Sequence, residues 1–94
     1  MAPKFEWDPA KALRNQAKHG MTFEEACSVF LDPLGRFRDD PRHSLAEHRL
    51  VLIGMTDHRR LVAVMFTEQD DRIRIISARP VTRAEQKTYE ETLR

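Results

Sequence analysis

The sequence predicts an α+β domain with a short N-terminal strand, two helices, an antiparallel meander of strands and a C-terminal helix. Two observations lead to this class. Apolar residues recur at helical spacing up to about residue 32, and after it they alternate or form short runs. Only a few residues join the last three of these runs, which suits antiparallel neighbours, because a parallel crossover needs a dozen or more. A chain of 94 residues suffices for one small domain, residues 1–94.

The first strand is expected over residues 4–7, directly before a helix over residues 9–19. Asp8 is placed to cap this helix, and Pro9 occupies the first helical position, where its missing N–H costs nothing. Gly20 provides the left-handed residue that ends the helix. Its apolar face is thin and consists of Ala10, Leu13 and Ala17, and a single row of cations follows another face at Lys11, Arg14 and Lys18.

A second helix is predicted to begin after Thr22, which forms a T-x-x-E capping box with Glu25. It should end at Asp32, because the residue before Pro33 is pushed out of the helical region. The single Cys27 excludes an internal disulfide and is expected to be a buried small hydrophobe. The apolar stripe of this helix consists of Phe23, Ala26, Cys27 and Phe30.

Four strands should follow as an antiparallel meander, with a polar loop over residues 39–46 after the first of them. They are predicted at residues 34–38, 49–53, 61–67 and 72–78.

A C-terminal helix is predicted after Pro80, because Thr82 and Glu85 form another capping box. Its few apolar residues, Ala84, Tyr89 and Leu93, lack a clean helical spacing. We therefore expect this helix to be the least firmly docked element and a candidate for contact with a partner.

Composition excludes several classes of protein. Charged residues make up 33% of the chain but the net charge is only +1, so binding to a polyanion would depend on local clustering. No apolar run is long enough to span a membrane and no signal-peptide core is present, so the expected location is the cytoplasm. The four histidines are dispersed and no glycine-rich phosphate loop occurs, so neither a metal site nor a cofactor is expected.

The run RIRIISARP, residues 72–80, is the most suggestive local pattern. Arg72 and Arg74 share one face of a strand, and Arg79 joins that face only if a β-bulge intervenes. A guanidinium group is always charged and its planar fork matches phosphate. The alternative interpretation is a solvated strand face without a ligand.

Together with its neighbours, this strand could support cleavage of RNA at the 2′-hydroxyl without a metal. That chemistry needs a base, a cation at the phosphorus and an acid for the leaving oxygen. Exposed histidines and surface ion pairs remain the alternative for each member of the set. The candidate catalytic residues are Glu47, His48, Arg49, Arg74 and Arg79, with His43 and Tyr89 as further candidates for the acid or base.

Three segments carry a resemblance to a known family: W-D-x-x-K, N-x-x-K-H-G and R-I-I-S-A-R, in this order and spacing. From Phe5 to Tyr89 the chain resembles the BrnT family of bacterial type II toxins. The resemblance implies a RelE-like ribonuclease fold, metal-free RNA cleavage and growth arrest. It also implies neutralisation by a BrnA-like antitoxin with a ribbon-helix-helix domain, which would bind DNA and repress the operon together with the toxin.

The positions that match the family pattern are Asp8, Lys11, Asn15, Lys18, His19, Glu47, Arg49, Arg74, Ser77 and Arg79. Asp8 already has a structural explanation as a helix cap. Lys11, Arg14, Lys18 and His19 are expected to contact RNA, and Arg74 and Arg79 to hold the scissile phosphate. Two other functions stay open: a non-catalytic corepressor that reaches DNA only through its antitoxin, and an RNA- or ribosome-binding domain that does not cleave.

Overall fold

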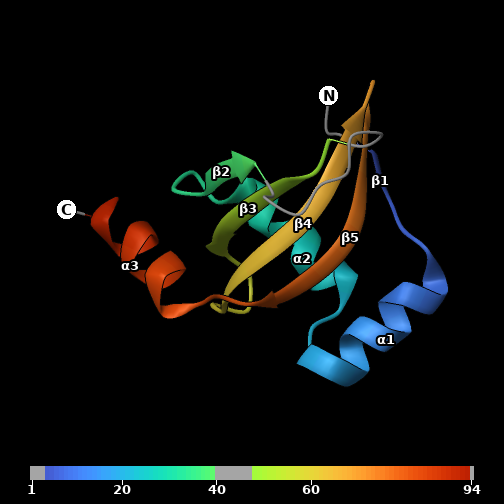
Figure 1. Cartoon of the computed structure of the whole chain (residues 1–94), viewed down its shortest axis with the longest axis horizontal. Helices are drawn as coiled ribbons and strands as arrows, with labels where there is room; N and C mark the ends of the chain where they lie inside the picture. The colour runs from blue at the N-terminus through green and yellow to red at the C-terminus, as the bar shows by residue number, and fades with distance from the viewer. Residues whose placement is uncertain (1–3, 40–47, 94) are drawn as a thin grey trace.

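A five-stranded sheet forms the centre of the structure, a computed structural model that describes residues 4–39 and 48–93 (Figure 1). The strand order is β1-β5-β4-β3-β2; β1 lies parallel to β5, and the other neighbours are antiparallel. The predicted four-strand meander is thus present, and β1 extends it at the far edge. The strands are β1 (Lys4–Glu6), β2 (Arg36–Asp39), β3 (Leu50–Met55), β4 (Leu61–Gln69) and β5 (Arg72–Pro80).

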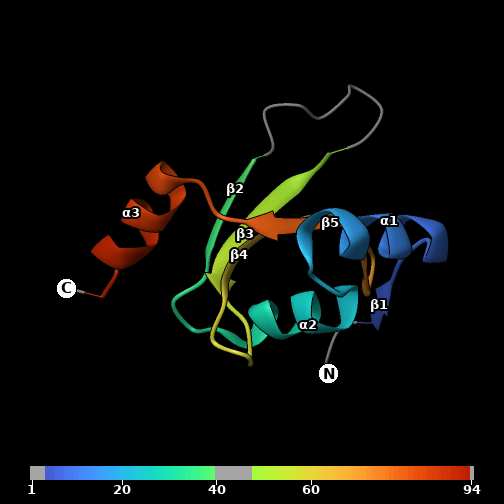
Figure 2. The ribbon, with the colours of Figure 1, turned by 90° about the horizontal axis from the view of Figure 1, so that it is seen from below.

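Helices cover parts of both faces of the sheet (Figure 2). The helix α2 (Phe23–Cys27) and the 3₁₀ turn η1 (Ser28–Leu31) pack on one face, and α3 (Arg83–Glu91) on the other. The helix α1 (Pro9–His19) lies beside β5. None of the helices in residues 4–39 and 48–93 is long and apolar enough to cross a membrane.

The core follows the alternation of side chains along the strands. Leu52, Val64 and Phe66 face α2 in the larger cluster, while Val51 and Ile53 belong to a smaller cluster on the other face. Tyr89 of α3 is 4% exposed and completes the smaller cluster. Only Glu85 and Tyr89 are buried in α3, which agrees with the sparse docking expected of this helix.

The caps of α1 and α3 are those that the sequence predicts. The Asp8 carboxylate accepts a hydrogen bond from the N–H of Ala10 at 2.8 Å, and Gly20 has a φ of 67°. Thr82 and Glu85 form both hydrogen bonds of the capping box.

Three predictions about the second helix were wrong in part. Its α-helical part ends at Cys27, and only the 3₁₀ turn continues to Leu31, with Asp32 as the capping residue. Its capping box is incomplete, because Thr22 accepts from the N–H of Glu25 while the Glu25 side chain binds Arg60. Cys27 itself is only partly buried, and burial raises the pKa of its thiol to about 11.

The predicted apolar face of α1 was also wrong. Leu13 is 70% exposed, and Ala10 and Ala17 are exposed as well. The helix is instead attached through Ala12, which packs on the core, and through Asn15, the one buried residue of α1. A buried amide that bonds the backbone of a strand can replace an apolar stripe, and a spacing rule for apolar residues does not detect it.

Candidate functional site

A β-bulge in β5 determines which way its last arginine points. Phe66 and Met65 are consecutive in β4, but their partners in β5 are Ile75 and Ser77. Ile76 is the extra residue, and it packs against the smaller core cluster. Residues an odd number of positions apart in a regular strand point to opposite faces of the sheet. One extra residue between them brings their side chains to the same face.

Because of this bulge, Arg79 lies on the same face of the sheet as Arg72 and Arg74. The sequence makes this placement conditional on a bulge, and the strand register shows one. Arg79 is opposite Ala63, whose side chain belongs to the cluster on the α3 face.

Asn15 fixes α1 next to this arginine. Its amide nitrogen donates to the carbonyl of Ala78 at 2.9 Å and to the carbonyl of Met21 at 3.1 Å. Its amide oxygen accepts from the N–H of Ala78 at 3.1 Å. Both polar groups of Ala78 that face α1 are therefore satisfied by one side chain, which holds the helix in register with the residue before Arg79.

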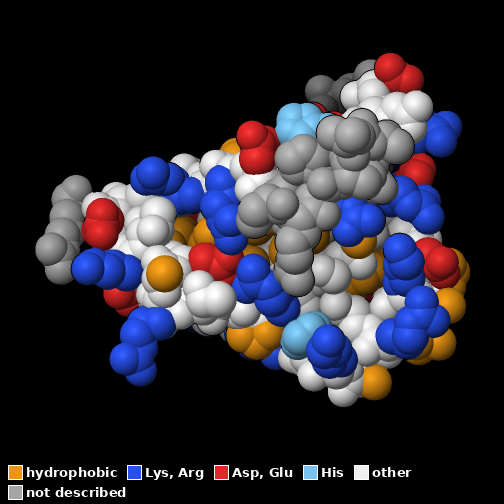
Figure 3. Space-filling view, viewed as in Figure 1, with side chains coloured by type: hydrophobic (Ala, Val, Ile, Leu, Met, Phe, Trp, Pro, Cys, Tyr) orange, Lys and Arg blue, Asp and Glu red, His pale blue; other side chains and the backbone are white. Residues whose placement is uncertain are grey.

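The cation row of α1 and Arg79 consequently line one hollow, which we call the α1 hollow. Figure 3 shows Lys and Arg side chains gathered over the region of α1. It has a volume of about 640 Å³, and none of the described residues that line it is acidic. Four cationic side chains and one histidine around a common hollow form a surface suited to a polyanion, although the whole chain carries a net charge of only +1. The lining residues are Lys11, Arg14, Asn15, Lys18, His19, Met65, Ile76, Ser77 and Arg79.

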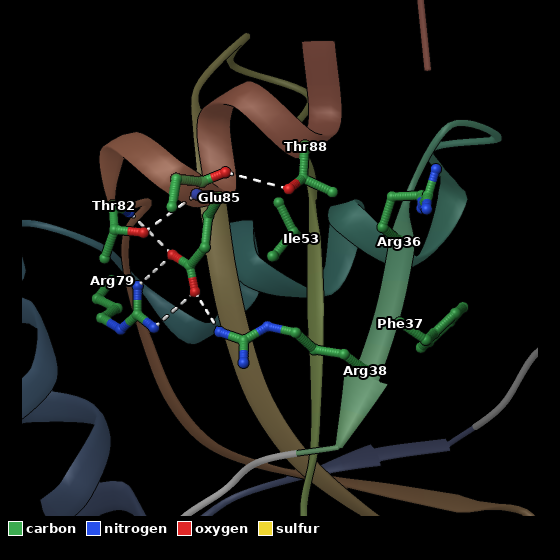
Figure 4. Close-up of a pocket in the computed structure, with 9 residues that line it drawn as sticks. Arg36, Phe37, Arg38, Ile53, Arg79, Thr82, Glu85 and Thr88 are labelled. Atoms are coloured by element: carbon green, nitrogen blue, oxygen red, sulfur yellow. Dashed lines mark hydrogen bonds and ion pairs between the residues drawn. The ribbon is translucent and has the colours of Figure 1, made fainter. Parts of the chain in front are cut away.

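Arg79 also lines a second hollow, between β2 and α3, which we call the α3 hollow (Figure 4). Here the Glu85 carboxylate accepts hydrogen bonds from Nη1 and Nη2 of Arg79 at 2.7 and 3.0 Å, and another from Nη2 of Arg38. The N–H of Thr82 donates to the same carboxylate at 2.8 Å. The volume of this hollow is about 470 Å³.

This arrangement holds Glu85 in its charged form. The two charges of Arg79 and Arg38 and the N–H of Thr82 outweigh the cost of burial, so the pKa of Glu85 falls to about 2. Two guanidinium groups thus bind one carboxylate at this point of the sheet.

Arg74, predicted to share one phosphate with Arg79, lies in a different environment. Its Nη1 is 3.1 Å from Oε2 of Glu6, and Arg72 also reaches this carboxylate, at 3.6 Å. Arg79 is five positions after Arg74 in the strand, which corresponds to roughly 16 Å between their backbones. The two arginines line separate hollows, and that of Arg74 contains three acidic residues, Glu6, Asp70 and Asp71.

Comparison with known proteins identifies the family. The family model described as "Ribonuclease toxin, BrnT, of type II toxin-antitoxin system" matches residues 7–85. The chain belongs to the BrnT family. A solved structure of the Brucella abortus ribonuclease toxin BrnT is 27% identical in sequence and superposes with a TM-score of 0.65, and the match covers 87% of this chain and 100% of that one. No curated protein matches the sequence.

The remaining residues predicted for the BrnT site are placed as follows. Glu47 and His43 lie outside the described residues. His48 is exposed, with Nε2 2.9 Å from Oδ1 of Asp39 at the end of β2. Arg49 is partly buried and directly precedes β3.

Tyr89, a further candidate for the acid or base, lines neither the α1 hollow nor the α3 hollow. Its hydroxyl donates to Oδ2 of Asp32 at 2.7 Å, and burial together with this carboxylate raises the pKa of Tyr89 to about 12. Asp32 also accepts from the N–H groups of Leu34 and Met55, so the pair ties α3 to the segment before β2. These contacts give Tyr89 a structural role between α3 and the segment before β2.

Sequence reasoning missed Arg38 and the position of Glu85. Arg38 had no pattern of its own, and Glu85 was fully explained as part of a capping box. The sequence did offer one indication for Glu85. A carboxylate accepts about four hydrogen bonds, so an acidic residue in a capping box can also bind a second partner. No group of three or more His, Cys, Asp or Glu side chains in residues 4–39 and 48–93 could hold a metal ion.

Proposed function

We propose that this BrnT-family chain is an endoribonuclease that cleaves RNA through its 2′-hydroxyl without a metal. The observation that supports this most strongly is the bulge in β5, which directs Arg79 to the hollow that the cation row of α1 lines. In this reaction the 2′ oxygen attacks the phosphorus and the bond to the 5′ oxygen breaks. The 2′ proton goes to a base, and an acid returns a proton to the leaving oxygen. The products are a 2′,3′-cyclic phosphate and a 5′-hydroxyl.

The proposed roles follow from charge and position. Lys11, Arg14, Lys18 and His19 bind the RNA backbone along the α1 hollow. Arg79 stabilises the charge that develops on the phosphate, because it is always protonated and is held in place by two hydrogen bonds to Glu85.

The base and acid are proposed among Glu47 and His48, which precede β3 in the sequence, with Arg49 as the next residue. An imidazole is the most frequent general acid or base in enzymes, and Nε2 of His48 lies 2.9 Å from Oδ1 of Asp39, which fixes the direction of the ring. Arg74 is proposed to contact the backbone further along the RNA, since it contacts Glu6 and lines a different hollow from Arg79.

In the cell, we propose that this activity arrests growth and that a BrnA-like antitoxin with a ribbon-helix-helix domain neutralises it. The type II family description supports a protein antitoxin, and the resemblance supports its kind. The toxin would reach DNA only through this partner, as corepressor of its own operon. We further propose a RelE-like fold and a cytoplasmic location, where RNA and antitoxin are both available.

The test is to incubate the purified protein with RNA in the presence of EDTA and to analyse the ends of the products. We expect cleavage in EDTA, with 2′,3′-cyclic phosphate and 5′-hydroxyl ends, and no cleavage at a site that carries a 2′-deoxy nucleotide. Intact RNA both with and without added Mg²⁺ would overturn the enzymatic proposal. Cleavage that requires Mg²⁺ would overturn its metal independence.

A further inference from the structure

Two arginines from strands that are not neighbours in the sheet meet at one buried carboxylate (Figure 4). Arg38 is on β2 and Arg79 on β5, with β4 and β3 between them. Three strand spacings separate their backbones, or roughly 14 Å, so both side chains must reach inward over the sheet to meet. They contact Glu85, whose side chain is only 7% exposed.

A purely structural ion pair would need only one of these arginines. Glu85 already receives two hydrogen bonds from Arg79 and one from Thr82. The Arg38 side chain is 43% exposed, and Glu85 is its one ion-pair partner in the described part of the chain. Its hydrogen bond to Glu85 uses Nη2, which carries two of the five N–H donors of a guanidinium group, and Arg38 itself lines the α3 hollow.

We propose that Arg38 binds a phosphate of the RNA backbone adjacent to the one at Arg79, and that Glu85 orients both guanidinium groups. This inference rests on the proposed function. RNA lying in the α1 hollow and passing over Arg79 would next enter the α3 hollow, since Arg79 lines both. Arg38 is the cation placed to receive its following phosphate, through a planar fork that matches the oxygens.

Glu85 is a positioning residue in this arrangement. A carboxyl with a pKa of about 2 is ionised at neutral pH but is a weak base, so it is poorly suited to take the 2′ proton. Its carboxylate fixes the direction of both arginines before RNA arrives. Pre-orientation of this kind lowers the reorganisation that the transition state requires.

The α3 hollow offers a matched control in the same strand. Arg36 also lines it and carries the same charge, and it is aligned across the strands with Arg79 through Ile53 and Ala63. In Figure 4 no interaction joins Arg36 to Glu85. Arg36→Ala therefore removes one positive charge from the hollow without disturbing the cluster at Glu85.

The test measures binding of a 2′-O-methyl RNA oligonucleotide, which lacks the 2′ proton needed for cleavage, at several salt concentrations. We expect Arg38→Ala to weaken binding roughly 10- to 100-fold. The slope of log K against log salt should decrease by about 0.7, which is the value for one phosphate contact with a single strand. Arg36→Ala should weaken binding less than about threefold, because it removes only a nearby exposed charge.

A second variant tests the role of Glu85. Glu85→Gln keeps the shape and the capping box but adds net positive charge, so it should bind the oligonucleotide at least as tightly as the wild type. We expect its cleavage rate to fall about tenfold or more, because the arginines lose their fixed direction. A purely structural Glu85 would change binding and cleavage together, in proportion to the folded fraction.

The outcomes separate this inference from the proposed function. Wild-type protein that neither cleaves RNA nor binds the oligonucleotide would overturn both. Cleavage by the wild type, with equal effects of Arg38→Ala and Arg36→Ala on affinity and slope, would overturn the inference alone. The inference alone would also be overturned if Arg38→Ala left RNA binding intact and weakened only the binding of an acidic partner peptide.

Discussion

Two buried glutamates in this protein are bound by arginines, and they differ in what surrounds them. Glu25 of α2 accepts from Nε and Nη2 of Arg60 and from the hydroxyl of Thr56, and it ties the β3–β4 turn to the helix. Glu85 of α3 accepts from two arginines. In both cases arginine contacts lower the pKa of the glutamate to about 2.

The difference lies in the number of arginines and in location. Glu25 binds one arginine, which also donates to the carbonyl of Gly20, and His58 lies 3.4 Å from the same carboxylate. Glu85 binds two arginines, and one of them, Arg79, also lines the hollow that contains the cation row of α1. The same pair of residue types therefore serves stability in one region and, in our proposal, ligand binding in the other.

The largest expected effect is on cleavage by Arg79→Ala. Loss of a group that stabilises developing charge costs about 100-fold or more in rate, so the specific activity should fall by at least that factor. RNA cleavage by the purified variant measures it, with thermal unfolding as the check on folding. Activity within a few-fold of the wild type would contradict the role given to Arg79.

Glu25→Ala should show the opposite behaviour. It leaves the buried Thr56 hydroxyl without its acceptor and Arg60 without its carboxylate partner, which costs about 2 kcal/mol, or roughly 10 °C in melting temperature for a domain of this size. Cleavage per folded molecule should stay at the wild-type value. A loss of cleavage at temperatures where the variant is folded would show that the two clusters do not differ in function as we propose.

The two glutamates should make the stability of the protein depend on pH in the same way. Both have a folded pKa of about 2 and an ordinary value of 4.5, so each adds stability that is fully present above about pH 5. This stability is lost as the pH falls from 4.5 toward 2, because the unfolded state binds protons first. Urea unfolding across this range should show a flatter pH dependence for both Glu25→Gln and Glu85→Gln, and an unchanged profile in either variant would count against its lowered pKa.

The smallest effect is expected for Tyr89→Phe. It removes only the hydroxyl bond to Asp32, which keeps its bonds to two backbone N–H groups, so the free energy of unfolding should decrease by about 1 kcal/mol. Cleavage by the folded variant should be unchanged, and a large loss of rate would return Tyr89 to the candidates for the catalytic acid. Chemical denaturation and the cleavage assay together measure both.

The order of the elements could be predicted from the sequence because it depends on local signals. The caps at Asp8 and Thr82, the glycine at residue 20 and the short connections of the meander all act within a few residues. The alternation of side chains along β5 was also enough to predict that Arg79 reaches the cationic face only if a bulge intervenes.

The details of the site could not be predicted in the same way. Whether Arg38 or Arg36 contacts Glu85 depends on side-chain directions across three strand spacings, which no local pattern records. The attachment of α1 through Asn15 is another long-range feature, because its partner Ala78 is 63 residues away. The family resemblance included Asn15 among its positions but did not distinguish a structural amide from a functional one.

The most direct measurement is an NMR titration of the arginine Nε–H signals with the 2′-O-methyl RNA oligonucleotide. The account predicts that the signals of Arg79 and Arg38 shift on binding, while that of Arg60, held by Glu25 outside both hollows, does not. A shift of Arg60 with Arg79 and Arg38 unchanged would contradict the assignment of the RNA site to the face that carries the β5 bulge.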